Sequence, residues 1–397
     1  MSVPGADPAA PVIVIGASAT GLQVVRDLGR SGRRVLVADA DADKPACFSR
    51  FLSGPPLIAD SLDGLLPLLR ETTDQVGRCV LVPASDIAVD FLIEHRETLA
   101  TYATSVSTFT PDTAGTFLDK RRFADLCERA GVPSPRLVEV TAETDLSVAV
   151  EGFSFPLLLK PSVGHLWRDR LAGRKLIVVE SSADLASTRQ QFGDLTGLMI
   201  QELIPGCEDN LWVSAMRVTP DGQTPQQFVG RKLRQHPLDY GSASWAESQQ
   251  NDEVAELSRR LAAASGFAGL MSTEFKYDAR DGRYQAIEVN PRPSLWWGLV
   301  AASGVPLVAD GCRQAAGEPI EPAAPGTGQQ VDGRRWLFAE KDLLSLLRQR
   351  PASRVPGRLL SYLREMATAS SRPIWSRDDR RPTAALLRYY LKRARRR

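Results

Sequence analysis

Two carboxylates and one carboxamide lie on a predicted hairpin, and they form the clearest chemical pattern in the chain. Residues 272–290 read as two alternating strands around an Asp-Gly turn, which is a strong hairpin signal. The alternation places Glu274 on one face of the first strand and Glu288 with Asn290 on one face of the second. If the registers match, their side-chain oxygens converge. Three oxygen ligands on rigid strands, with room for water and phosphate oxygens, suit Mg²⁺.

A lysine ends an otherwise apolar strand earlier in the chain. Residues 155–161 read Phe-Pro-Leu-Leu-Leu-Lys-Pro, so we expect a buried strand that carries Lys160 at its end. The alternative is a surface lysine whose aliphatic stem covers apolar surface. A polar loop follows over residues 162–175, and another apolar strand follows over 198–204. Before them, apolar residues at helical spacing predict a helix between Asp119 and Gly131.

These elements are preceded by a predicted parallel sheet. Three short apolar runs, at residues 12–15, 35–38 and 80–83, are separated by helical stretches, which is typical of an α/β unit. The turn from Gly16 to Gly21 has two interpretations. A dinucleotide-binding loop would have glycine where Ser18 stands, although Asp39 lies close to where a ribose-binding acid would be. The alternative is a tight strand-to-helix turn.

The composition narrows the class of protein. The chain has 397 residues, 43% of them hydrophobic and 24% charged, which suits a globular protein of two to three domains. This composition excludes the disordered, collagen-like and disulfide-scaffold classes of protein. No apolar run reaches the ~18 residues that span a bilayer, and the N-terminal residues lack the pattern of a secretory signal. The five cysteines are scattered without CxxC spacing, so we expect reduced thiols and a cytoplasmic protein.

The charge is unevenly distributed. Residues 334–397 contain 18 Lys/Arg and 5 Asp/Glu, whereas the whole chain has a net charge of only +2. The preceding body is therefore acidic on average, and the end of the chain attracts anions. Residues 318–333 are rich in Pro, Ala and Gly and read as a linker, and three short amphipathic stretches follow it.

The order of these motifs resembles the ATP-grasp superfamily, which includes D-alanine–D-alanine ligase and biotin carboxylase. More narrowly, it resembles the poorly characterised ATP-grasp carboxylate–amine ligases. The motifs that carry the resemblance are Asp119-Lys120, Ala130–Pro135, Leu158–Pro161, Gln201–Gly206, Glu274 and Ile287–Arg292. Each is weak alone, but their joint order and spacing over residues 11–305 is specific.

The resemblance implies an α/β fold that is α+β in part. A Rossmann-like preATP-grasp domain would occupy residues 1–110, and a two-lobed ATP-grasp core residues 111–317, with its small lobe at about 123–204. The linker at 318–333 and a basic helical C-terminal segment at 334–397 would follow. In such proteins the N-terminal domain usually helps to hold the acceptor substrate.

The resemblance also implies which cations meet the nucleotide. Lys120 and Lys160 match the family's two nucleotide-phosphate lysines. ATP brings about four negative charges, and each cation ~4 Å away is worth ~4 kcal/mol at an effective dielectric of ~20, so several cations are needed. Lys232 is expected as a further phosphate or carboxylate contact, and Arg292 as a contact of phosphate or acyl phosphate oxygens.

The remaining family positions concern the base, the ribose and the metal. Gln201 stands where the family has an adenine-contacting acid, a departure that gives the position both a donor and an acceptor. Glu208 matches the ribose-binding acid, with Asp209 as its rival. Backbone groups of Glu202, Leu203 and Ile204 would meet the adenine edge, and the Mg²⁺ (or Mn²⁺) ligands would be Glu274, Glu288 and Asn290. The loop at 162–175 stands where the family's phosphate-covering loop lies.

The sequence therefore predicts an ATP-dependent ligase that activates a carboxylate as an acyl phosphate and joins it to an amine. Two alternatives stay open: a nicotinamide-dependent oxidoreductase that uses the Gly16 turn, and an ATP-grasp binding protein without turnover. The expected partners are small-molecule carboxylate and amine substrates, without nucleic acid, and a homodimer is a further expectation. The basic C-terminal segment either packs on the acidic body or contacts an anionic membrane at the inner surface.

Overall fold

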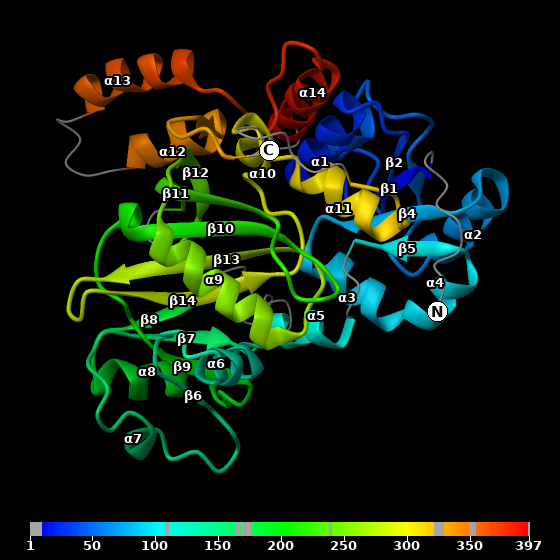
Figure 1. The fold of residues 1–397 in the computed structure, drawn as a ribbon. Coiled ribbons are helices and arrows are strands. Elements are labelled where there is room, and N and C mark those ends of the chain that lie inside the picture. Colours follow the sequence, from blue (N-terminus) through cyan, green and yellow to red (C-terminus); the bar gives the residue numbers. More distant parts are fainter. Residues whose placement is uncertain are drawn as a thin grey trace.

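The computed structural model describes residues 10–107, 111–162, 167, 171, 176–237, 240–320, 329–348 and 355–395. Three sheets organise these residues, and Figure 1 shows the N-terminal sheet on one side of the molecule and the two others on the opposite side. The predicted α/β class, with parallel and antiparallel sheets, is confirmed.

The N-terminal sheet is parallel and has the strand order β3-β2-β1-β4-β5. Its strands are β1 (Val12–Ile15), β2 (Val35–Asp39), β3 (Leu57–Ile58), β4 (Cys79–Pro83) and β5 (Thr104–Val106). Its helices are α1 (Ala19–Arg30), η1 (Pro45–Phe48), α2 (Leu65–Val76), α3 (Asp86–Glu94) and α4 (Arg96–Thr101). Because β1 and β4 are neighbours, the turns that follow them meet at the carboxyl edge of the sheet.

The Gly16 turn is held closed by its own surroundings. Gly16 has φ +110°, which an L side chain rarely adopts, and a Cβ on Gly21 would lie 1.9 Å from the Gly16 carbonyl oxygen. The N–H of Ala17 donates to the Asp39 carboxylate at 2.6 Å, and the same carboxylate pairs with Lys44 at 2.7 Å. Asp39 is thus engaged by the turn and by Lys44, which favours the tight turn over a ribose-binding acid.

The second sheet is small and antiparallel, with the order β6-β9-β7-β8. It contains β6 (Leu137–Glu139), β7 (Leu157–Pro161), β8 (Ile177–Val179) and β9 (Leu198–Glu202), with α7 (Leu146–Ala149) and α8 (Ser182–Phe192). Helices α5 (Pro111–Leu118) and α6 (Lys120–Arg129) precede it. The apolar side chains of α6 belong to a core that is shared with the large sheet. The small lobe is predicted at about 123–204, and the sheet within it covers residues 137–202.

The third sheet is the largest and has the order β14-β13-β10-β11-β12-β15. Its strands are β10 (Leu211–Val218), β11 (Gln226–His236), β12 (Ser242–Ser248), β13 (Gly269–Asp278), β14 (Arg283–Asn290) and β15 (Arg335–Leu337). The short helix η2 (Glu208–Asn210) precedes it, and α9 (Asp252–Ser265), α10 (Trp297–Ala302) and α11 (Leu307–Ala316) complete this part of the chain. The boundary proposed at residue 317 falls directly after α11.

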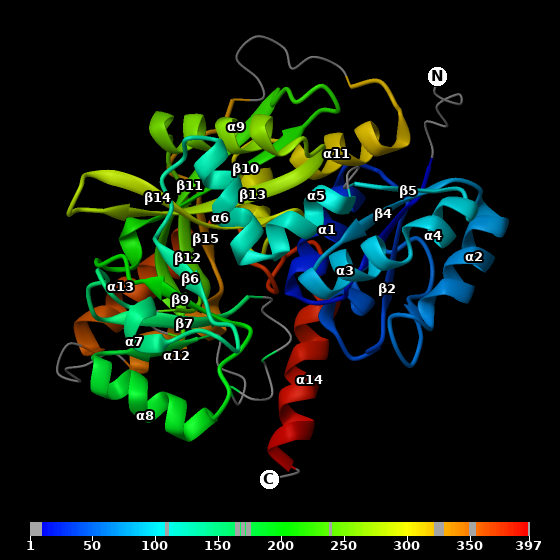
Figure 2. The same cartoon turned by 90° about the horizontal axis from the view of Figure 1, so that it is seen from below.

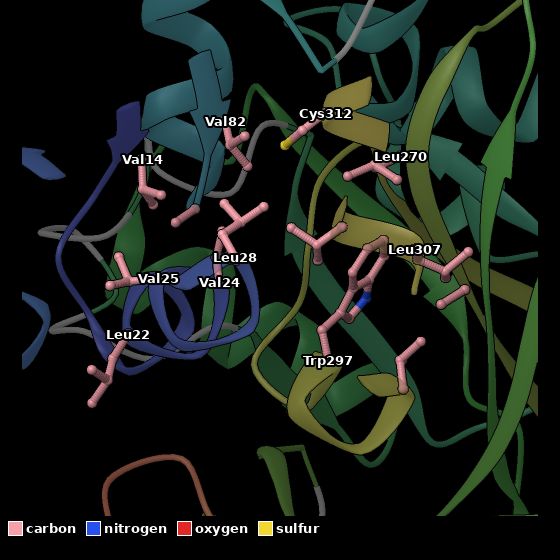
Figure 3. Packing of buried hydrophobic residues seen from close by; sticks show 14 of the residues in the cluster. Val14, Leu22, Val24, Val25, Leu28, Val82, Leu270, Trp297, Leu307 and Cys312 are labelled. Carbon is pink, nitrogen blue, oxygen red and sulfur yellow. The ribbon is translucent and has the colours of Figure 1, made fainter. Parts of the chain in front are cut away.

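A continuous apolar core joins the N-terminal sheet to the large sheet. Val14, Val82 and the inner face of α1 contribute from one side, and Leu270, Trp297, Leu307 and Cys312 from the other (Figure 3). Because burial of apolar side chains is the dominant stabilising term, this core fixes the two sheets relative to each other. The carboxyl edge of the N-terminal sheet is thereby fixed beside the large sheet.

The C-terminal segment is tied to both of these sheets. The first predicted amphipathic stretch begins as strand β15, which pairs with β12, and α12 (Ala339–Arg348) follows it. Asp342 on α12 is fully buried and accepts hydrogen bonds from Arg234 at 2.7 and 3.0 Å. Helices α13 (Val355–Thr368) and α14 (Arg381–Arg395) come next, and α14 begins against η1 and then extends away from the body (Figure 2).

None of the helices in the described ranges combines the length and the apolar composition that crossing a bilayer requires.

Candidate active site

The predicted acidic hairpin forms with the register that brings its oxygens together. Glu274 on β13 lies directly opposite Glu288 on β14, and Asn290 lies opposite Ser272, two residues along. Like charges directly opposite each other on a sheet are unfavourable without a counter-ion. Asn290 is buried, and its carboxamide makes no hydrogen bond with the part of the chain that the structure describes. The hairpin therefore presents two facing carboxylates and an unsatisfied amide group.

Two lysines share a face of the large sheet with Glu274. Lys232 on β11 is only 4% exposed, and its ammonium group lies 3.3 Å from Glu274 Oε2. Lys276 follows Glu274 by two residues and donates to the carbonyl oxygen of Ile204 at 2.7 Å. The predicted Lys232 thus reaches the acidic hairpin, while Lys276, which we did not expect at the site, binds the segment after β9.

The small sheet turns one face toward its own core and the other face away from it. Leu157 and Leu159 on β7 belong to that core, as do Leu198 and Ile200 on β9. Because side chains alternate along strands, Leu158, Lys160, Met199 and Gln201 must share the opposite face. The register agrees, since Leu158 pairs with Gln201 and Lys160 with Met199. On this face Lys160 and Gln201 lie diagonal to each other, and the apolar Leu158 and Met199 occupy the other two positions.

Lys120 and Lys160 lie close together between the two sheets. The N–H of Lys120, at the start of α6, donates to the carbonyl oxygen of Ser162, just past the end of β7. Burial, followed by the positive charge of Lys120, lowers the pKa of Lys160 to about 8, and the carboxylates of Glu288 and Glu274 oppose this shift. Burial also lowers the pKa of Lys120, against Glu288, Asp86 and Asp119. Neither ammonium group forms an ion pair with any residue in the described ranges.

Arg292 links the hairpin to the N-terminal sheet. Its guanidinium group donates to Asp86 Oδ1 from Nε at 2.7 Å, and a second nitrogen lies 2.6 Å from the same oxygen. Asp86 is the first residue of α3, at the carboxyl edge of β4. The arginine that we expected at the phosphate is thus fixed at the junction between the hairpin and the N-terminal sheet.

Known proteins share both the fold and part of the sequence. No protein-family model matches the chain. A D-aspartate ligase from Enterococcus faecium is 23% identical over 305 residues, which are 71% of this chain and 70% of that protein. The ADP complex of an N5-carboxyaminoimidazole ribonucleotide synthetase superposes with a TM-score of 0.62 at 16% identity, over 79% of this chain and 78% of the other. A biotin carboxylase from Campylobacter jejuni superposes with a TM-score of 0.60 at 17% identity, over 78% and 72%.

The chain has the fold of the ATP-grasp ligases of known structure. Some curated relatives are much longer than this chain. It spans 20% of the length of the carbamoyl phosphate synthase large chain from Vibrio parahaemolyticus, to which it is 28% identical over 223 residues.

The segment predicted to meet the adenine edge, residues 202–204 between the two lobes, has some of its backbone groups already engaged. The N–H of Glu202 donates to the carbonyl oxygen of Arg136 at 2.9 Å, and the carboxylate of Glu202 pairs with Arg280 at 2.8 Å. The carbonyl oxygen of Ile204 accepts from Lys276. A base at this segment would therefore meet Leu203 and the N–H of Ile204, while the buried Gln201 carboxamide, which bonds to no described residue, lies on the adjoining face.

The position predicted to bind the ribose is only partly described. Glu208 lies in η2, but its side chain falls outside the described residues. The carboxylate of its rival, Asp209, lies 3.2 Å from Arg231 and accepts from the thiol of Cys207. Asp209 is thus held by its neighbours, and Glu208 stays the prediction. Most of the loop at 162–175 also lies outside the described residues.

Two site residues, Asp86 and Lys276, were not assigned from the sequence. Strand alternation already placed Lys276 beside Glu274, but its contact with Ile204 depends on how the two sheets meet. Asp86 follows an apolar strand and a capping serine, which is the position where parallel sheets expose polar side chains at their carboxyl edge. That pattern could have suggested it.

The lowered pKa of Lys160 predicts a pH dependence for binding of a polyanion. Below about pH 7 the ammonium group is charged both with and without the ligand, so the affinity should be constant. Above about pH 8 the free protein has lost this proton and must take it up again on binding, because the anion raises the pKa of Lys160. We expect the dissociation constant of Mg²⁺–ATP to rise with pH in this range.

Calorimetry above about pH 8, in two buffers of different ionisation enthalpy, measures the proton uptake. We expect uptake approaching about one proton, and no such uptake in Lys160→Arg because an arginine stays charged. Equal uptake in both proteins would assign the proton to another group.

Proposed function

We propose that the protein is an ATP-dependent carboxylate–amine ligase. The observation that carries this proposal is the pair of half-buried lysines, Lys120 and Lys160, which have no ion-pair partner in the described chain and face the acidic hairpin. Buried charges without partners are costly, so a site of this kind calls for an anionic ligand. The triphosphate of ATP supplies that anion, and the ligase relatives supply the class of reaction.

The residues of the hairpin fit a magnesium ion. Glu274, Glu288 and Asn290 offer only oxygen donors, which hard cations prefer, and the facing carboxylates lose their repulsion when a cation binds. The described residues contain no group of three or more His, Cys, Asp or Glu that could hold a metal without help. The amide of Asn290, phosphate oxygens and water would therefore complete the ligand set. When bound, the ion neutralises charge on the transferring phosphoryl group.

The protein's own residues would act by positioning and by charge stabilisation. Lys120 and Lys160 hold the phosphates from the side of the small sheet, and Lys232 and Arg292 hold the anionic substrate from the side of the large sheet. The substrate carboxylate attacks the γ-phosphorus, which gives an acyl phosphate and ADP. The amine then attacks the acyl carbon, the C–N bond forms, and the C–O bond to phosphate breaks. No covalent bond to the protein is needed.

A screen of ADP release tests the proposal directly. The full chain is incubated with Mg²⁺–ATP and paired carboxylates and amines, and ADP and phosphate are measured against reactions that lack one substrate. We expect ADP release that requires both substrates, together with no fluorescence response to NADH. Tight binding of Mg²⁺–ATP without turnover for any pair would favour the binding protein, and a saturable NADH response would favour the oxidoreductase.

We further propose that the end of α14 contacts an anionic membrane surface. Leu387 is 56% exposed beside the exposed Arg388, and α14 extends away from the body there (Figure 2). An exposed apolar side chain within a basic helix suits a surface of anionic lipids. The full chain should co-sediment with phosphatidylserine vesicles, and a variant that lacks residues 384–397 should not. Equal co-sedimentation of the two proteins would exclude the contact. The homodimer and the cytoplasmic location stay predictions.

A further inference from the structure

Asp86 lies where the N-terminal sheet meets the acidic hairpin. It follows β4 and is the first residue of α3, whose N-terminal cap is the side chain of Ser85. A carboxylate is favoured at this end of a helix by the helix dipole. Its side chain is 47% exposed, so the group is accessible although it belongs to a junction between two sheets.

The two oxygens of Asp86 are used unequally. Oδ1 accepts a hydrogen bond from Arg292 Nε at 2.7 Å, and a second guanidinium nitrogen lies 2.6 Å from the same oxygen. Oδ2 makes no hydrogen bond with any residue that the structure describes. The negative charge of Asp86 is also felt by the ammonium group of Lys120, which places the carboxylate next to the phosphate-binding lysines. One oxygen therefore orients Arg292, and the other is left for a ligand of the site.

The charges of the site leave an ammonium substrate with few places to bind. The side chains that line it are mostly cations: Lys120, Lys160, Lys232, Lys276 and Arg292. Glu274 and Glu288 are assigned to the metal. Asp119 also lies near Lys120, but its carboxylate caps α6, and the carboxylate of Glu202 pairs with Arg280. Among the described residues that line the site, Asp86 is then the carboxylate that remains for a positively charged group.

We propose that Asp86 Oδ2 binds the ammonium group of the amine substrate. This inference rests on the proposed ligase function, and it assigns the amine as one that is protonated at neutral pH. Arg292, held by Oδ1 of the same carboxylate, then holds the acyl phosphate beside the amine. One ammonium proton first passes to an acyl phosphate oxygen, which frees the lone pair of the nitrogen. The nitrogen then forms its bond to the acyl carbon, the C–O bond to phosphate breaks with its electron pair on phosphate, and the second proton follows, so that phosphate leaves as H₂PO₄⁻.

Two nucleophiles of different charge separate binding of the amine from activation of the carboxylate. Hydroxylamine is largely uncharged at neutral pH and traps an acyl phosphate as a hydroxamate, so it does not need an anionic binding group. In Asp86→Asn, the carboxamide oxygen still accepts from Arg292, so we expect hydroxamate formation from Mg²⁺–ATP and the carboxylate to stay within about threefold of wild type. With an ammonium substrate, we expect its KM to rise about ten- to a hundredfold, because a hydrogen bond to a charged group is lost.

A matched variant tests whether loss of any ion pair between the N-terminal part and the rest of the chain would have the same effect. Glu318→Gln breaks the two-point ion pair with Arg33, at 2.6 Å, which joins the N-terminal part to the residues after α11. It should leave both nucleophiles unaffected. Calorimetry should also show that Asp86→Asn binds Mg²⁺–ATP as wild type does.

The outcomes distinguish the proposals. Equal loss of hydroxamate and amide formation in Asp86→Asn would make Asp86 only a support for Arg292, and unchanged amide formation would remove it from the site. Either result would overturn this inference and leave the ligase function intact. If the wild-type protein made neither product, the ligase proposal itself would fail, and this inference with it.

Discussion

Replacing Lys160 by methionine should abolish nucleotide binding while leaving the fold intact. Methionine keeps the length of the side chain and removes the charge, and it relieves the cost that already lowers the pKa of Lys160 to about 8. A cation ~4 Å from a phosphate is worth ~4 kcal/mol at an effective dielectric of ~20, before desolvation is counted. We therefore expect the dissociation constant of Mg²⁺–ATP to rise at least about a hundredfold, and ADP release to disappear.

A lysine elsewhere in the chain supplies the control. Lys341 on α12 lies over the ring of Phe338, 4.8 Å from its centre, and has no part in the site. Lys341→Met should bind Mg²⁺–ATP as wild type does, and Lys160→Met should unfold at the same or a higher temperature than wild type. If Lys160→Met kept wild-type affinity in calorimetry, the assignment of the phosphate site would be wrong.

Replacing Asp379 by alanine should cause a large loss of stability. Asp379 is fully buried and binds Arg26, whose side chain is 3% exposed, at 2.9 Å. It also accepts from the hydroxyl of Ser49 and the N–H of Arg50. Removing it leaves a buried guanidinium group without its counter-ion, and breaking a buried pair in this way costs about 3–5 kcal/mol.

The neighbouring residue provides a matched comparison. Asp378 pairs with Arg30 at the same 2.9 Å, but both side chains are about half exposed, and exposed pairs contribute about 1 kcal/mol or less. Urea denaturation should therefore show a large loss of unfolding free energy for Asp379→Ala and a small one for Asp378→Ala. Similar losses in the two variants would mean that the C-terminal segment is not anchored through Arg26.

Local patterns were sufficient to predict the elements that carry the site. The apolar runs that predict strands became β1, β2 and β4, and the Asp-Gly turn joins β13 to β14 with Glu274 opposite Glu288. Strand periodicity fixes which side chains share a face, so it could place the hairpin acids and Lys160. It carries no information about distant contacts. The pair of Asp86 with Arg292, residues 206 positions apart, depends on how two sheets pack.

The C-terminal segment also shows that a local pattern does not reveal distant contacts. Its composition predicts amphipathic helices, and α12, α13 and α14 form, but the first stretch begins as strand β15 at the edge of the large sheet. Trp336 is fully buried there, and its indole N–H donates to the carboxamide of Gln23 on α1. An edge strand forms because a neighbour offers backbone groups, and a pattern within the segment itself does not reveal that neighbour.

A crystal structure of the protein with Mg²⁺ and a non-hydrolysable ATP analogue tests the central claim most directly. We predict that the phosphates lie between Lys120 and Lys160 on one side and Glu274, Glu288 and Asn290 on the other, with the metal bound by oxygens of the hairpin. A nucleotide bound at the Gly16 turn, or phosphates that contact neither lysine, would contradict the account.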